Sequence, residues 1–117
     1  MFTALVHGPS MAPTLRHGDA LLVRRGGRRV RPGDVVVARF RTRPDLLVVK
    51  RAVRERPDGW WVESDNSLTA DDSRAYGPAD VVGRVVCRWW PRPALLSRRH
   101  RRRNPPGDGQ VPERGNQ

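Results

Sequence analysis

Ser10 is the first residue of the sequence whose surroundings favour chemistry. It lies between Pro9 and Pro13 in the stretch HGPSMAPTLRHGD, residues 7–19. Proline fixes φ and offers no backbone donor, so we expect this serine on a constrained loop and not inside a helix or a central strand. A serine held in this way is either part of a turn or a nucleophile. If it is a nucleophile, another part of the chain must supply a base.

The three histidines are weak candidates for that base. His7 lies on the same short loop as Ser10, and no carboxylate that could orient it is evident beside it. His17 is a loop residue, and His100 falls in the C-terminal tail. For each histidine, a surface position without a catalytic role is the simpler interpretation.

Lys50 is the stronger candidate, because it is the only lysine among the 23 lysine and arginine residues of the chain. Arginine stays protonated, whereas burial lowers the pKa of a lysine and turns it into a general base. Lys50 lies in the apolar run LLVVKRAV, where such burial is expected. A solvent-facing strand lysine is the alternative. Because Ser-Lys pairs are an established form of nucleophile and base, we expect Ser10 and Lys50 to act together.

A third candidate region is the polar loop ESDNSLTADDSRAYGP, residues 63–78. Its acidic residues raise the possibility of a calcium loop of the EF-hand type. The spacing excludes it, because Ser67 and Thr69 fall at ligand positions and Ala70 occupies the turn position that requires glycine. We expect instead that Asp72 and Arg74, with Ser73 between them, form a pair that braces a site. A structural salt bridge without a catalytic duty is the alternative.

Short strands must position these residues. Valine-rich runs, each bounded by turn signals such as PGD, TRPD or PDG, occur at residues 20–25, 35–40, 46–54, 60–64 and 80–90. Such runs are typical of hairpin strands, and no helical periodicity extends over a long window. The pattern predicts an all-β domain, an antiparallel curled sheet or a partly open barrel.

Composition limits this fold to one small domain. The chain has 117 residues, 37% of them hydrophobic, and a mean hydropathy of -0.69. From Arg92 the sequence is rich in Arg, Pro and Gly, so we expect a folded domain over residues 1–91 and a disordered tail over residues 92–117. No apolar run of about 18 residues and no signal peptide are visible. The single cysteine, Cys87, allows no internal disulfide and no zinc cluster, which favours a cytoplasmic protein.

The net charge of the chain bears on the kind of partner that it binds. The formal net charge is +11, and the tail carries a dense run of arginines. This favours contact with an anionic surface, although a charge run that only aids solubility explains it equally well. A nucleic-acid-binding module is a further alternative. The tail has no interleaved aromatic residues and no recognisable reading motif, so we expect no stable nucleic-acid complex.

Taken together, these segments resemble the signal peptidase I family of serine-lysine endopeptidases. The similar segments follow one another in the family's order: GPSMAPTL, GDALLV, GDVVVARF, KRAV, DNSLTADDSRAYGP and VVGRV. The resemblance implies that Ser10 is the nucleophile, that Lys50 is the base, and that no metal or cofactor is required. It also implies the curled β-sheet fold of that family.

The sequence departs from the family at two positions near the site. The family often has a hydroxyl residue where this chain has Gly8, so an oxyanion would rely on backbone N–H groups such as that of Ser10, in the loop that continues with Met11. The family also often has a serine where this chain has Ala70, and that serine orients the lysine. Thr69 or Ser73 is expected to replace it.

The substrate expected from the resemblance is a precursor protein. We expect no membrane anchor before Ser10, and in this the chain resembles the maturation proteases of nickel-type superoxide dismutase. That similarity implies removal of the N-terminal propeptide of the nickel enzyme in the cytoplasm. The alternative is signal peptidase-like processing of secretory precursors, with the segment RWWPRPALLSRRHRRR as a peripheral membrane anchor.

Overall fold

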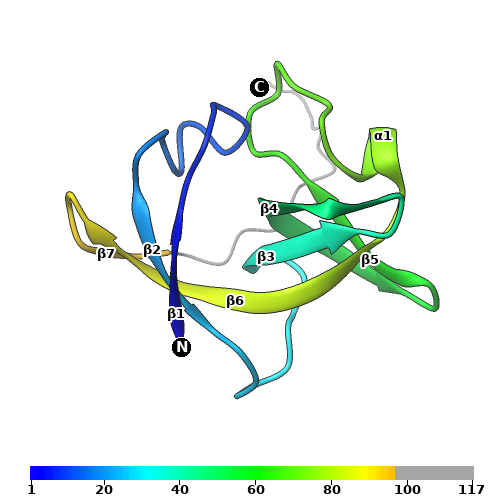
Figure 1. Ribbon diagram of the computed structural model, residues 1–117, viewed down its shortest axis with the longest axis horizontal. Helices are drawn as coiled ribbons and strands as arrows, with labels where there is room; N and C mark the ends of the chain where they lie inside the picture. Colours follow the sequence, from blue (N-terminus) through cyan, green and yellow to red (C-terminus); the bar gives the residue numbers. More distant parts are fainter. Residues whose placement is uncertain (97–117) are drawn as a thin grey trace, which may run out of the picture.

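The computed structural model describes residues 1–96 of the chain and consists mainly of one antiparallel β-sheet (Figure 1). This confirms the predicted fold class. The elements in chain order are β1 (Phe2–Leu5), β2 (Ala20–Arg24), β3 (Val35–Phe40), β4 (Arg43–Arg56), β5 (Gly59–Glu63), α1 (Ser73–Tyr76), β6 (Ala79–Trp90) and β7 (Ala94–Leu95).

The sheet is curled around its long strand β6. The strand order is β1-β2-β6-β3-β4-β5, and β7 pairs with the far end of β6. β6 pairs with β3 along its first half and with β2 along its second half, so it bends between the two groups of strands seen in Figure 1. A single pair, Trp60 with Ala79, also joins β5 to β6. The long loops that follow β1 and β5 lie together at one end of this curled sheet (Figure 1).

The five predicted strands are present, but one predicted turn is misplaced. The chain reverses at Arg41 and Thr42, and β4 already begins at Arg43, so Pro44 lies inside a strand. The register jumps at this point between β3 and β4, and a proline is tolerated where the ladder is irregular. The sequence did not predict β1, β7 or the single-turn helix α1. No helix within residues 1–96 has the length and apolar character needed to cross a membrane.

The predicted tail begins inside the described part of the chain. Ala94 and Leu95 form β7 and pair with Arg88 and Cys87 of β6, so the sheet continues past the predicted domain boundary at Pro91. Residues 97–117, which include the dense arginine run and the rest of the tail predicted to be disordered, lie outside the described residues.

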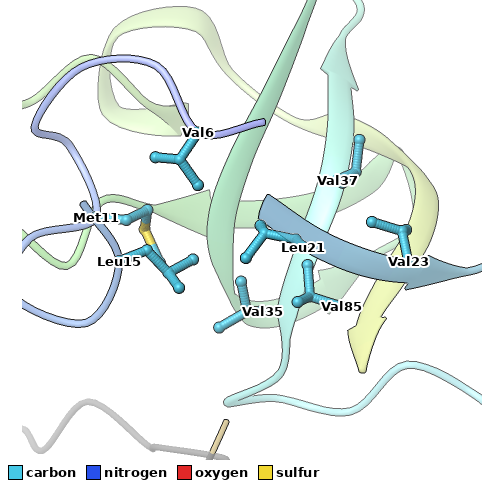
Figure 2. Close-up of a cluster of buried hydrophobic side chains, with 8 residues drawn as sticks. All are labelled: Val6, Met11, Leu15, Leu21, Val23, Val35, Val37 and Val85. Carbon is cyan, nitrogen blue, oxygen red and sulfur yellow. The ribbon is translucent and has the colours of Figure 1, made fainter. Parts of the chain in front are cut away.

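Both faces of β3 are buried, which produces two hydrophobic clusters. Val36, Ala38 and Phe40 face one cluster, whereas Val35 and Val37 face the other, as the alternation of a strand requires. The second cluster contains Val6, Met11, Leu15, Leu21, Val23, Val35, Val37 and Val85 (Figure 2). Met11 and Leu15 reach it from the loop between β1 and β2, so the loop that carries Ser10 is anchored in the core.

Candidate active site

Ser10 and Lys50 line the same pocket. Its volume is about 300 Å³, and it lies between the end of β1 with the following loop and the first half of β4. Ser10 is half-buried, and Lys50 is only 3% exposed. Apart from these two residues, the walls are mainly apolar and come from Leu5, Val6 and the β4 residues 46–49. The two residues predicted to form a dyad therefore reach one cavity from distant parts of the sequence.

The Ser10 loop is fixed from two sides. On the side of the hydrophobic core, Met11 is 1% exposed, and its carbonyl oxygen accepts a hydrogen bond of 2.9 Å from the N–H of Leu15. From the loop after β5, the backbone N–H of Asn66 donates to the carbonyl oxygen of Ser10 at 2.8 Å. The Asn66 side-chain amide donates to the carbonyl oxygen of Pro9 at 2.9 Å. These bonds hold the backbone on both sides of the Ser10 side chain.

A buried ion pair connects the loop after β5 to β4. Arg51, next to Lys50 in sequence, is 1% exposed and donates to both carboxylate oxygens of Asp65, at 3.1 and 2.5 Å. The hydroxyl of Thr14 donates to Asp65 at 2.6 Å. Asp65 therefore links the strand that carries Lys50 to the loop that carries Ser10.

The Lys50 amine is desolvated and bonded to a residue that sequence reasoning missed. Nζ donates to the hydroxyl of Ser64 at 3.2 Å, and within residues 1–96 the Ser10 hydroxyl is not one of its hydrogen-bond partners. Burial lowers the pKa of Lys50 below its usual value, although the charges of Asp71 and Asp72 act in the opposite direction. A lysine in this state is prepared to accept a proton.

The predicted Asp72–Arg74 pair is formed and lies directly behind Ser64. Arg74 donates to the two oxygens of Asp72 at 3.0 and 2.7 Å, and the N–H of Ser64 donates to Asp72 at 2.7 Å. Burial opposes ionisation, but these hydrogen bonds outweigh it and hold the pKa of Asp72 below its usual value. Ser73 has a backbone role, because its hydroxyl accepts the N–H of Val62 at 2.9 Å.

Of the backbone N–H groups near Ser10 that are candidates for binding an oxyanion, one is occupied and one is not. Gly8 adopts a φ of 79°, and its N–H donates to Nδ1 of His17 at 3.0 Å. This N–H is therefore occupied, while the N–H of Ser10 takes part in no hydrogen bond within the described part of the chain. His17 is exposed, as expected for a surface residue, and its ring accepts this hydrogen bond from the turn just before the nucleophile candidate.

Ser64, which the sequence did not single out, is identified by the register of β4 and β5. β4 and β5 pair Arg51 with Glu63 and Ala52 with Val62. Continuing this register by one step places Ser64 opposite Lys50, and directly opposite side chains lie on the same face of a sheet.

Among residues 1–96, no group of three or more His, Cys, Asp or Glu side chains is arranged to hold a metal ion.

Comparison with known proteins identifies the family. A Peptidase S24-like family model matches residues 1–86, and the chain therefore belongs to the Peptidase S24-like family. The chain is 34% identical to mitochondrial inner membrane protease subunit 1 of Xenopus tropicalis in an alignment that covers 72% of this chain and 66% of that protein. Subunit 1a of the mitochondrial ATP-independent inner membrane protease of Arabidopsis thaliana is 30% identical over 76% of this chain and 70% of its own length.

A third relative, mitochondrial inner membrane protease subunit 1 of Schizosaccharomyces pombe, is 31% identical over 80% of this chain and 76% of its own length. The chain thus spans roughly two thirds to three quarters of these relatives, from 66% in the frog protein to 76% in the yeast protein. No solved structure matches it. The relatives support the expected resemblance to proteases of the signal peptidase type. Their names give no support to the expectation of a nickel superoxide dismutase substrate.

Proposed function

We propose that this protein is a serine endopeptidase in which Ser10 is the nucleophile and Lys50 is the general base. The observation that carries the proposal is the shared pocket, in which a loop-held serine and a desolvated lysine amine face the same cavity. The family membership of the chain and the names of its relatives support a peptide bond as the target.

The proposed reaction uses one amine in four proton transfers. Neutral Lys50 takes the proton of the Ser10 hydroxyl as its oxygen bonds to the scissile carbonyl carbon, and the resulting ammonium protonates the leaving amine as the C–N bond breaks. A water molecule then attacks the acyl ester and gives its proton to Lys50, which returns it to Ser10 as the acyl group leaves. The N–H of Ser10 is the candidate donor to the oxyanion.

The substrate is proposed to bind as an extended strand in the same pocket. Among the described strands, β1 pairs only with β2, and residues 47–50 of β4 pair only with β3. Both edges have unused backbone donors and acceptors, and both contribute pocket residues, Leu5 from one side and Leu47 from the other. A peptide placed along either edge would add a strand to the sheet next to Ser10.

The test of the dyad is cleavage of a peptide library, with the new N-termini read by mass spectrometry. The wild-type protein should generate a consistent set of cuts. Ser10→Ala and Lys50→Arg should generate none, because the first lacks the nucleophile and a guanidinium cannot accept the proton. Arg39→Lys, an exposed substitution on β3, is the matched control and should cut as the wild type does. Substantial cleavage by Lys50→Arg would refute the dyad.

The finer proposal for the substrate, taken from the sequence resemblance, is the N-terminal propeptide of nickel-type superoxide dismutase. The relatives act, by their names, at a mitochondrial inner membrane, which favours a precursor presented at a membrane as the second candidate. Parallel incubation with a nickel superoxide dismutase precursor and with a secretory precursor separates the two. A cut only at the propeptide junction supports the first, and a cut only at the secretory junction supports the second.

The proposed place of action follows the same division. The first substrate requires a cytoplasmic protein. Peripheral membrane binding is favoured by Trp89, Trp90 and Leu95, which are 46, 56 and 83% exposed on β6 and β7. Cell fractionation at physiological salt decides between them: recovery wholly in the soluble fraction excludes the membrane-bound version.

A further inference from the structure

A lysine that acts as a general base must be neutral, and the lone pair of its amine must point toward the serine hydroxyl. The neutral amine has one lone pair and two N–H groups, and rotation about the Cε–Nζ bond can point the lone pair away from the serine. A hydrogen-bond acceptor that takes one N–H group stops this rotation. The resemblance placed such an acceptor at the position of Ala70, which has no hydroxyl, so another residue must supply it in this chain.

Three hydroxyl residues of the polar loop are candidates for this role. Within residues 1–96, Ser73 accepts no hydrogen bond from Nζ; its hydroxyl accepts the backbone N–H of Val62 instead. Thr69 lines the pocket, but its buried hydroxyl has no hydrogen-bond partner within residues 1–96 and does not contact the amine of Lys50 through a hydrogen bond. Ser64 alone of the three accepts a hydrogen bond from Nζ, at 3.2 Å.

Ser64 is held more rigidly than a surface serine would be. Its side chain is fully buried, at 0% exposure, and its backbone N–H donates to Asp72 at 2.7 Å. Asp72 is itself 0% exposed, caps α1 and is paired with Arg74. The β4–β5 register fixes the same residue from the other side, because Arg51 pairs with Glu63 one step away. The Ser64 hydroxyl therefore has a fixed place beside the amine.

We propose that Ser64 positions the Lys50 amine and thus replaces the orienting hydroxyl that is missing at Ala70. This role rests on the proposed Ser10–Lys50 dyad. With one N–H group directed to Ser64, the remaining N–H and the lone pair of the neutral amine are left for the pocket, into which Ser10 also faces. The Asp72–Arg74 pair then braces the site indirectly, by fixing the backbone of Ser64.

The experiment compares Ser64→Ala with Ser64→Thr and Ser67→Ala in the cleavage assay. Ser64→Ala should lower kcat about 10- to 100-fold with little change in KM, below the full contribution of roughly 10²–10⁴ that a general base supplies. Ser64→Thr keeps the hydroxyl and should restore most of the rate. Ser67→Ala, which removes an exposed hydroxyl of the same loop outside the pocket lining, should cleave at the wild-type rate. Ala70→Ser, added to Ser64→Ala, places a hydroxyl at the family's usual position and should recover part of the loss.

A second readout separates positioning from a merely structural role. Because Lys50 is the only lysine, a protein labelled with 13C-lysine gives one side-chain NMR signal, and its titration reports the pKa of this amine without any substrate. The Ser64 hydroxyl accepts more strongly from the charged ammonium, so its removal should lower the pKa of Lys50 further. Asp71 and Asp72, the carboxylates that act on this amine, remain in the variant. The acidic limb of the pH profile of kcat/KM should therefore move to lower pH, and the maximum value of kcat/KM should fall.

The outcomes are distinguishable. If Ser10→Ala still cleaves, the proposed function itself is wrong. If Ser10→Ala is inactive and Ser64→Ala cleaves at the wild-type rate with an unmoved pH limb, the dyad stands and the role of Ser64 is refuted. A rate loss with an unchanged pKa of Lys50 and a lower unfolding midpoint also refutes it, because that pattern is structural. Should Ser64→Ala fail to fold, Ser64→Cys decides: its thiol fills the same space but accepts hydrogen bonds only weakly, so the rate should fall there too, and an undiminished rate refutes the role of Ser64.

Discussion

The backbone N–H of Asn66 donates to the carbonyl oxygen of Ser10 at 2.8 Å. This bond joins the loop after β5 to the loop after β1, two segments that are far apart in the sequence. The Asn66 side-chain amide adds a second bond to the neighbouring Pro9. The polar loop therefore does two things: it supplies Ser64 to Lys50, and it holds the backbone that presents Ser10.

Asn66→Ala tests this connection. The change removes the side-chain bond to Pro9 and the acceptor for the N–H of Leu68, so we expect a loss of about 0.5–1.5 kcal/mol in the free energy of unfolding. Cleavage should fall more than this small loss explains, because the Ser10 loop is less well held. Urea unfolding and kcat/KM are measured together. Ser67→Ala, an exposed neighbour, is the control, and equal effects from both variants would contradict the prediction.

Met11→Ala tests how the core anchors the nucleophile loop. Met11 is 1% exposed and packs among the residues shown in Figure 2, so its truncation leaves a cavity and should cost about 2–5 kcal/mol in the free energy of unfolding. Met11→Leu conserves most of the volume and should cost less than about 1.5 kcal/mol. Chemical denaturation measures both. A negligible effect of Met11→Ala would show that the loop is not fastened through this side chain.

Lys50→Met should affect stability in a pH-dependent way. The pKa of Lys50 is lowered in the folded protein, so between the folded and unfolded pKa values the unfolded chain binds more protons, and the stability of the wild type rises with pH. Below the folded pKa the wild type must bury an ammonium, and there the Met variant should be the more stable. The advantage of Lys50→Met should therefore shrink as pH rises, measured by urea unfolding at several pH values. A constant difference would mean that the pKa of Lys50 is not shifted.

Arg51→Met should lower the stability of the protein, whereas Lys50→Met should raise it below the folded pKa of Lys50. The two residues are nevertheless neighbours on the same strand. Removing the guanidinium breaks the ion pair with the Asp65 carboxylate, whose side chain is 8% exposed. Breaking a buried pair from one side costs about 3–5 kcal/mol, and the loss should appear as a lower denaturation midpoint. Arg39→Met, at an exposed site on β3, should stay within about 0.5 kcal/mol of the wild type.

Local sequence features predicted much of the sheet. The run VVVARF is β-branched, alternates between two buried faces and is bounded by turn signals, so β3 was predicted with its observed limits. β1 was missed because four residues with no turn signal before them carry little information. α1 was missed for a related reason: one turn of helix is too short for a periodic pattern, even though Asp72 caps it.

The candidate site could be predicted only in part from the sequence. Residue type and composition single out Ser10 and Lys50, because a lone lysine in an apolar strand among many arginines is visible without a structure. The partners Ser64 and Asn66 are defined by strand register and by a contact between two loops, and neither leaves a local pattern. The hydroxyl predicted to orient Lys50 was sought at Thr69 or Ser73, whereas the amine bonds to a residue brought opposite by β5.

The most direct test of the dyad compares two pKa values of the wild-type protein. One is the pKa of the Lys50 amine, titrated by NMR through its single lysine signal. The other is the pKa of the acidic limb of kcat/KM, which reports the essential base of the free enzyme. The dyad predicts that the two coincide and lie below the usual value for lysine. Full cleavage activity at a pH where the Lys50 amine is still protonated would contradict it.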